Sequence, residues 1–302
     1  MSKSVKVAIL GSTGMLGGMV ARFLSQQPEY DLCVIDHRGG EFPFDAAQVS
    51  VESLVYLLNG QDYIINCIGI IKPRIDEQNS CSVQRAVRVN ALFPHMLAEV
   101  AERVGARVLQ IATDCVYSGQ GASAGSYFES SPHDPLDVYG KTKSLGEVRS
   151  PTVRHLRCSI VGPEQVDPPR PVCSLLQWFL AQPPSATVSG FTNHFWNGVT
   201  TLAFARLCHG IMSDERNFPV LPPVQHVLPA YAIPKSELLR NFAHFYSRRD
   251  IRIEEKEAAS RVDRTLATER PEVNEGLWQA AGYPAPPTIR EMVAEMAGEV
   301  SR

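Results

Sequence analysis

Residues 5–17 read VKVAILGSTGMLG and join a short apolar run to a glycine-rich turn. The apolar run has the length and composition of a strand that is buried on both faces of a parallel sheet. Gly11, Gly14 and Gly17 then form a G-x-x-G-x-x-G pattern, and Met15–Gln27 continues with helical spacing. This order suits a dinucleotide pyrophosphate, because the glycines allow close backbone approach and the helix N-terminus offers unpaired N–H donors. Dinucleotide contacts are therefore predicted at Gly11, Thr13, Gly14, Met15, Leu16 and Gly17.

Strand-like and helix-like segments alternate throughout the first half of the chain. Strands are predicted at Leu32–Ile35, Tyr63–Ile68, Arg107–Ala112 and Val153–Val161, and helices at Val51–Leu58, at Val83–Val104 with a kink at Pro94, and from about Leu136. Strands joined by helical crossovers form a parallel, doubly wound α/β sheet of the Rossmann type.

The composition and the apolar spacing of the chain change after Gly162. Proline-rich pieces interrupt shorter helical runs such as Ser174–Ala181 and Lys235–Tyr246. This indicates a smaller, mixed α/β lobe over the carboxyl edge of the sheet, where ligands bind in such folds. We predict a dinucleotide-binding domain over residues 1–162, to which the chain returns around residues 195–222. The remainder of residues 163–302 is predicted to be mainly a substrate-binding lobe.

Composition is that of an ordinary globular protein, with 44% apolar and 20% charged residues among 302. The 29 basic and 32 acidic residues give a net charge of −3, which directs the chain neither to nucleic acid nor to an anionic membrane. The chain enters its first strand at once and has no apolar run long enough to span a bilayer, so we expect no signal peptide and a cytoplasmic location. Seven scattered cysteines without a C-x-x-C pair predict neither a metal site nor a disulfide framework.

Charged side chains follow the second predicted strand at Asp36 and Arg38. A carboxylate there can bind the ribose 2′-hydroxyl of NAD, whereas an arginine can pair with the 2′-phosphate of NADP. Because both are present, both cofactors stay open, with NADP(H) favoured over NAD(H). Further cofactor contacts are predicted at Asp45 and Ala46, near the adenine, and at Cys67, Ile68 and Gly69, where the next strand ends.

Tyr139 and Lys143 lie four residues apart on a predicted helix, and therefore on one face of it. Reduction of a ketone needs a proton donor at the developing alkoxide, but a free tyrosine titrates at about 10. A lysine ammonium beside it, together with an oxidised nicotinamide, favours the phenolate, so we predict that Lys143 lowers the pKa of Tyr139 and also holds the cofactor ribose. Thr113, at the end of the strand Arg107–Ala112, is suited to bind the substrate oxygen. These three residues are the predicted catalytic group.

Several stretches of the chain resemble extended short-chain dehydrogenases, and within them the dTDP-4-dehydrorhamnose reductase-like group of sugar-nucleotide enzymes. They are GSTGMLGG, NCIGIIKP, VNALFPHMLAE, ATDCVYSG, DVYGKTKSLGE, LRCSIVGPE and DRTLA, between residue 5 and about residue 268. The resemblance implies an NAD(P)-dependent oxidoreductase with a Thr113, Tyr139 and Lys143 triad. It also implies a nicotinamide cofactor on the N-terminal domain and a 4-keto-6-deoxy nucleotide-sugar, the substrate to be reduced, in the C-terminal lobe.

Substrate contacts are expected at Lys72, Cys115, Trp196 and Arg264. The Arg264 guanidinium can bind two oxygens of a diphosphate at once. Arg74, two residues after Lys72, is a further candidate for contact with the same substrate. Asp114-Cys115 stands where rhamnose reductases usually carry Asp-Tyr, so the preferred sugar can differ.

Cys115 also resembles the cysteine that GDP-L-fucose synthases use for epimerisation. That chemistry needs a second acid/base, typically a histidine, and the family's position for it falls near Cys173 or Ser174. His194 follows further on, in FTNHFWNG.

Two other functions remain open. One is a nucleotide-sugar epimerase or dehydratase that keeps NAD bound and oxidises and then reduces the same sugar. The other is a non-catalytic, NADP-binding regulatory subunit, since the β subunits of methionine adenosyltransferase are similar to these reductases. A homodimer is compatible with each of these functions.

Overall fold

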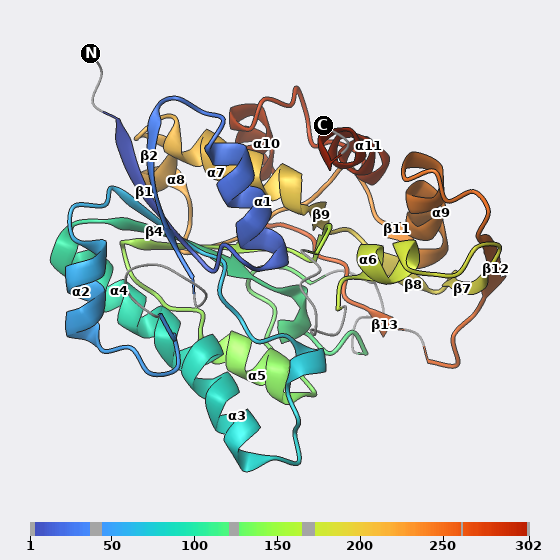
Figure 1. The fold of residues 1–302 in the computed structure, drawn as a ribbon, viewed down its shortest axis with the longest axis horizontal. Helices are drawn as coiled ribbons and strands as arrows, with labels where there is room; N and C mark the ends of the chain where they lie inside the picture. Colours follow the sequence, from blue (N-terminus) through green and yellow to red (C-terminus); the bar gives the residue numbers. More distant parts are fainter. Residues whose placement is uncertain (1–3, 37–43, 121–126, 165–172, 261, 301–302) are drawn as a thin grey trace.

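The computed structural model describes residues 4–36, 44–120, 127–164, 173–260 and 262–300 (Figure 1). Its centre is a six-stranded sheet with the order β10-β5-β4-β3-β1-β2. These strands are β1 (Val5–Leu10), β2 (Tyr30–Ile35), β3 (Tyr63–Asn66), β4 (Arg107–Ala112), β5 (Val153–Arg157) and β10 (Val224–His226). All neighbouring strands are parallel. The chain reverses its direction across the sheet between β1 and β3, which confirms the predicted doubly wound α/β class.

Helices cover both faces of this sheet (Figure 1). One face carries α1 (Met15–Leu24), α7 (Thr201–Met212), α8 (Asn217–Val220), α10 (Pro271–Ala280) and α11 (Ile289–Val300), and the other α2 (Val51–Leu58), α3 (Ser80–Ala86), α4 (Phe93–Val104) and α5 (Val138–Leu145). Val7 and Ile9 of β1 pack in the core on the α1 side, whereas Ala8 and Leu10 pack in the core on the α2 side. Since successive strand side chains point to opposite faces, a strand covered on both faces must be apolar throughout.

The turn between β1 and α1 depends on glycine at two positions. Gly11 has a φ of +85°, which side chains rarely tolerate. A Cβ on Gly17 would lie 2.2 Å from the carbonyl oxygen of Gly11. Gly17 therefore allows the first turn of α1 to pack directly on the end of β1. This contact places the N-terminus of α1, with Gly14 as its N-cap, at the carboxyl edge of the sheet.

Two predicted elements are divided in the structure. A π-helical turn, Val87–Leu92, separates α3 from α4, so the helix widens just before Pro94 instead of kinking at it. Proline has no N–H to donate to the carbonyl four residues earlier, which here belongs to Asn90. The predicted strand Val153–Val161 forms β5 and a separate β6 (Ile160–Val161), which pairs with β9 (Val199–Thr200).

Beyond residue 172 the described chain also builds two small sheets, seen at the right of Figure 1. One contains β11 (Ile233–Pro234), β8 (His194–Trp196) and β13 (Val262–Asp263), and the other β12 (Arg252–Lys256) and β7 (Thr187–Phe191). Helices α6 (Leu175–Leu180) and α9 (Lys235–Phe245) lie beside them. The first of these sheets is mixed, since β8 pairs antiparallel with β11 and parallel with β13. Among the residues with a described structure, no helix is both long and apolar enough to cross a bilayer.

Candidate active site

A continuous cleft runs along the carboxyl edge of the main sheet. Its inner part is a cavity of about 450 Å³ whose walls include residues that follow β1, β3, β4 and β5, such as Thr13, Cys67, Thr113 and Cys158. The small lobe supplies the opposite wall, including Trp196. A second cavity of about 1460 Å³ extends past the glycine turn to the end of β2. Both cavities share the lining residues Thr13, Gly14, Cys67, Ile68, Gly69 and Arg74.

Thr113, Tyr139 and Lys143 all line the inner cavity. Thr113 directly follows β4, and α5 begins after Asp137, whose carboxylate accepts a hydrogen bond of 2.8 Å from the Gly140 N–H. A Cβ on Gly140 would lie 2.3 Å from the carbonyl oxygen of Cys115, so α5 packs directly on the segment after β4. This close approach places Tyr139 beside Thr113 in the wall of the inner cavity.

The surroundings of Tyr139 in the protein favour its protonated form. Burial raises the pKa of this phenol above its ordinary value, and the Cys115 and Asp114 side chains act in the same direction, while the hydrogen bond with Thr113 opposes them. Burial thus dominates in the protein alone, while the prediction that Lys143 and an oxidised nicotinamide together lower this pKa stays a prediction. Tyr139 keeps its proton at neutral pH, as a proton donor must.

Lys143 is almost fully buried, and its Nζ donates a hydrogen bond of 3.0 Å to the carbonyl oxygen of Ile111. Burial lowers the pKa of Lys143 to about 8, although the Glu147 carboxylate one helical turn later favours the charged form. The ammonium is thus fixed against the end of β4 and loses its charge more readily than an exposed lysine.

Asp114 and Cys115 line the same cavity beside Tyr139. Burial raises the pKa of Asp114, an effect that the positive charges of Arg264 and Lys235 oppose. Burial also raises the pKa of Cys115 to about 12, so the thiol stays neutral at physiological pH. None of the described residues that line the inner cavity is a histidine. Proton transfer by Cys115 with a histidine partner is therefore not supported by this arrangement.

Most predicted cofactor residues line the cleft. Met15 and Leu16 line the inner cavity and Gly11 the outer one, while Gly17 lines neither and acts through packing. The outer cavity also includes Asp36, Asp45 and Ala46. The Asp36 carboxylate accepts a hydrogen bond of 3.0 Å from the Ser12 hydroxyl, and Asp45 forms two hydrogen bonds of 3.0 Å with Arg85. Arg38 lies outside the described residues.

The predicted substrate residues are only partly brought together. Trp196 and Cys115 line the inner cavity. Lys72 is 65% exposed, forms an ion pair of 2.8 Å with Asp137 and lines neither cavity. Arg264 also lines neither, but its Nε donates a hydrogen bond of 2.9 Å to the carbonyl oxygen of Tyr117. His194 lies away from the inner cavity, where its Nε2 contacts the carbonyl oxygen of Ser260 at 3.0 Å.

Sequence reasoning missed one residue that lines the site and one that supports its wall. Lys235, the first residue of α9, lines the inner cavity, and burial lowers its pKa. It belongs to no motif, so the sequence carries no signal for it. Asn90 is buried in the π-helical turn, where its side-chain amide donates to the Ile70 carbonyl at 2.9 Å and to the Thr142 hydroxyl at 3.1 Å. A buried asparagine between apolar helix positions was a usable signal, because such a group needs hydrogen-bond partners.

The described residues contain no cluster of histidine, cysteine, aspartate or glutamate that could hold a metal ion. The inner cavity is lined by a phenol, an ammonium and a hydroxyl, groups that can serve acid/base chemistry.

Comparisons with known proteins give a consistent result. The dTDP-4-dehydrorhamnose reductase of Aggregatibacter actinomycetemcomitans is 28% identical over 145 residues, which cover 47% of this chain and 45% of that protein. The methionine adenosyltransferase 2 subunit beta of Xenopus laevis is 30% identical over 148 residues, covering 48% and 42%. The chain thus matches a little under half the length of these curated relatives.

A solved structure is similar over nearly its whole length. The dTDP-4-dehydrorhamnose reductase of Bacillus anthracis, in complex with NADP, has a TM-score of 0.75 at 17% identity and covers 98% of this chain and 99% of its own. At that identity the similarity concerns the fold. The family model described as "RmlD substrate binding domain" matches residues 5–161, just over half of the 302 residues. The chain therefore belongs to the RmlD substrate-binding-domain family.

Proposed function

We propose that this chain is an NADP(H)-dependent oxidoreductase that reduces the keto group of a 4-keto-6-deoxy nucleotide-sugar. The observation that carries the proposal is the half-buried Tyr139 phenol, which shares one cavity with the Thr113 hydroxyl and the Lys143 ammonium. The names of several relatives, which are dTDP-4-dehydrorhamnose reductases, support the reaction and suggest the sugar class.

The cleft fits a dinucleotide. The N-terminus of α1 opens into both cavities at Thr13 and Gly14, and the tight contact of Gly17 with Gly11 leaves the backbone there accessible to a pyrophosphate. Cys67–Gly69 and Lys143 would lie at the nicotinamide end, and Asp36 and Asp45 at the adenosine end. Arg74 and Arg85 also line the outer cavity, paired with Glu164 and Asp45, and either guanidinium would bind the additional phosphate of NADP by exchanging its carboxylate partner.

When bound, NADPH supplies a hydride for the carbonyl carbon. The Thr113 hydroxyl binds the carbonyl oxygen, and Tyr139 gives its phenolic proton to that oxygen as it becomes an alkoxide. The ketone thus gains a hydride and a proton and becomes an alcohol, and a proton from solvent restores the phenol. Lys143 places positive charge near the transient phenolate and fixes the cofactor ribose. Such a positioned proton donor is typically worth about 10²–10⁴ in rate.

The alternatives receive less support. An epimerase or dehydratase that begins by oxidising the sugar needs a base first, whereas burial keeps Tyr139 protonated and Cys115 neutral. A regulatory subunit has a specific observation in its favour, the 30% identity to a methionine adenosyltransferase subunit. The grouping of Thr113, Tyr139 and Lys143 in one cavity favours a catalyst.

Turnover with a defined substrate tests the proposal. The purified chain is mixed with NADPH and a dTDP-4-keto-6-deoxyhexose, with the UDP and GDP analogues in parallel. We expect NADPH to be consumed in proportion to the alcohol formed, and NADH to be used more slowly. Retained NADPH binding without reduction of any of the three ketones would overturn the proposed activity and favour the regulatory alternative.

The lowered pKa of Lys143 predicts a pH dependence of cofactor binding. A lysine is charged below its pKa, so this ammonium is lost as the pH rises through about 8. We expect the Kd for NADPH, measured by calorimetry, to be constant below that pH and to rise above it. Lys143→Met should bind more weakly, with a Kd that does not change across the same range. A flat profile for the unaltered protein would contradict this assignment.

A further inference from the structure

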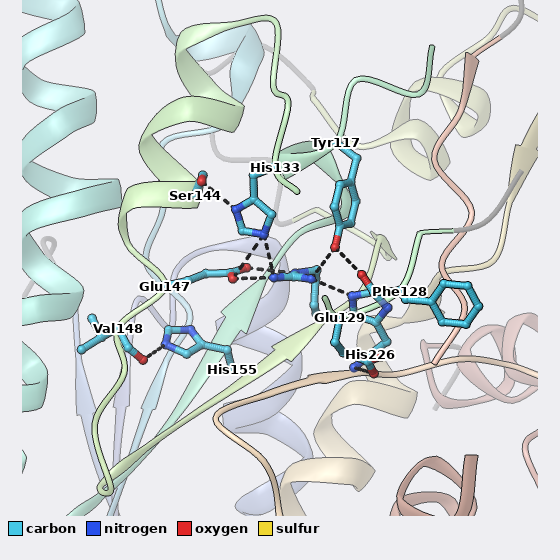
Figure 2. Close-up of polar contacts among 10 residues, drawn as sticks. Tyr117, Phe128, Glu129, His133, Ser144, Glu147, Val148, His155 and His226 are labelled. Atoms are coloured by element: carbon cyan, nitrogen blue, oxygen red, sulfur yellow. Dashed lines mark hydrogen bonds and ion pairs between the residues drawn. The ribbon is translucent and has the colours of Figure 1, made fainter. Parts of the chain in front are cut away.

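Figure 2 shows a network of polar side chains, one of which, Glu147, lies one helical turn after Lys143. Its centre is Arg157, the last residue of β5, which is 1% exposed. The guanidinium donates to Glu147 at 3.0 and 2.5 Å, to the Tyr117 hydroxyl at 2.7 Å, and to the Nε2 atoms of His226 at 2.7 Å and His133 at 2.9 Å. None of these five residues lines the inner cavity. Any effect of the network on the reaction must therefore pass through other residues.

Tyr117 is a member of this network whose backbone contacts Asp114, a residue that lines the inner cavity. Its side chain is fully buried, and its hydroxyl accepts from Arg157 and donates to the carbonyl oxygen of Phe128 at 2.8 Å. The ring stacks on Tyr127 with a centroid distance of 4.2 Å. The backbone N–H of Tyr117 donates to the carbonyl of Asp114 at 3.0 Å, which closes the turn that carries Cys115. The tyrosine is thus fixed at its ring, its hydroxyl and its backbone.

The backbone carbonyl of Tyr117 is the acceptor for the Nε–H of Arg264, at 2.9 Å. Arg264 in turn acts electrostatically on Asp114 and Cys115, both of which line the inner cavity. Because an Nε hydrogen bond fixes the plane of a guanidinium, the position of this one carbonyl sets the direction in which the two terminal nitrogens can meet a ligand. The Tyr117 carbonyl therefore provides a direct connection between the buried network and a cation that acts on the cavity wall.

We propose that Tyr117 is a positioning residue, whose hydroxyl, held by Arg157 and by the Phe128 carbonyl, fixes the backbone carbonyl that orients Arg264 toward the diphosphate of a nucleotide-sugar. This inference rests on the proposed function, because it requires a nucleoside-diphosphate ligand. A phenylalanine at residue 117 would keep the stack on Tyr127 and fill nearly the same volume. Removal of the hydroxyl alone therefore tests the positioning of Arg264 without changing the packing of the ring.

The test is calorimetric titration of dTDP into the full chain at saturating NADP⁺. We expect Tyr117→Phe to raise the Kd for dTDP about fivefold, the effect of losing roughly one hydrogen bond, and to leave the Kd for NADP⁺ unchanged. Tyr283→Phe is the matched control, since it removes a hydroxyl that donates to Glu295 at 2.6 Å and lines neither cavity. This control should bind both ligands as the unaltered protein does.

A double-mutant cycle shows whether Tyr117 acts through Arg264. In an Arg264→Ala background, Tyr117→Phe should cause no further loss of dTDP affinity. Arg264→Lys tests the same contact without altering the buried network, because lysine keeps the positive charge but lacks the Nε donor. This variant should also bind dTDP more weakly. It therefore gives a result even if Tyr117→Phe folds poorly.

Three results would overturn the positioning role of Tyr117. They are an unchanged Kd for dTDP in Tyr117→Phe, an equal loss with and without Arg264, or full affinity in Arg264→Lys. Failure of the unaltered chain to bind dTDP, UDP or GDP would instead overturn the proposed nucleotide-sugar substrate, and this inference with it.

Discussion

Replacing Tyr139 by phenylalanine is expected to lower kcat for NADPH-dependent ketone reduction by at least about 100-fold. The substitution keeps the ring and removes only the hydroxyl of a side chain that lines the inner cavity with Thr113. The developing alkoxide then has no positioned proton donor, although Thr113 can still bind the oxygen. Because neither the glycine turn nor Lys143 is altered, the Kd for NADPH should stay within about twofold, which is less than 0.5 kcal/mol.

Steady-state kinetics and a separate fluorescence titration of NADPH measure the two quantities. Tyr246→Phe is a suitable control, because among the described residues its buried hydroxyl has no hydrogen-bond partner. That variant should retain both turnover and binding. Substantial turnover by Tyr139→Phe would show that the proton comes from another group, and the mechanism proposed above would fail.

Replacing Glu147 by alanine is expected to lower the free energy of unfolding by about 3–5 kcal/mol. The carboxylate is 9% exposed and pairs with two nitrogens of the Arg157 guanidinium, which is 1% exposed. Removal of the carboxylate leaves a buried positive charge without its counter-charge, and desolvation of that charge is not compensated. Burial raises the pKa of Glu147, but its hydrogen bonds to Arg157 and the charge of that residue lower it below its ordinary value overall.

Urea denaturation gives the unfolding free energies for this comparison. Glu255→Ala provides the matched control, since the pair between Arg240 and Glu255 is about half exposed on both sides. An exposed pair contributes only about 0–1 kcal/mol. Similar losses in the two variants would contradict the account of the buried network.

The spacing of apolar residues in the sequence was sufficient to predict several strands and helices of the main sheet. The predicted bounds of Val51–Leu58 and Arg107–Ala112 match α2 and β4, because a helix or strand packed in the core repeats its apolar residues at a characteristic spacing. The π-helical turn before Pro94 could not be predicted from spacing. A Cβ on Gly146 would lie 2.1 Å from the carbonyl oxygen of Asn90, so this turn is packed against a helix more than fifty residues away in sequence.

The candidate active site also contains residues that a sequence motif predicts and features that depend on the tertiary structure. Thr113, Tyr139 and Lys143 were predicted from motif spacing, and they line one cavity. The direction of the Tyr139 pKa shift was not predicted, because burial is a tertiary property that the motif does not contain. Lys72 was expected at the substrate but pairs with Asp137. Lys235 was missed because its place at the cavity depends on how the small lobe folds. The roles of these residues in catalysis, and the division of the chain at residue 162, stay predictions.

The most direct test of the proposed ketone reduction traces the hydrogen that NADPH transfers to the sugar. The chain is incubated with NADPH that carries deuterium at both hydrogen positions of nicotinamide C4 and with a dTDP-4-keto-6-deoxyhexose, and the product sugar is analysed by mass spectrometry and NMR. The account predicts one deuterium at the former carbonyl carbon for each NADPH consumed. Conversion of the sugar without net loss of NADPH, or an alcohol that carries no label at that carbon, would contradict it.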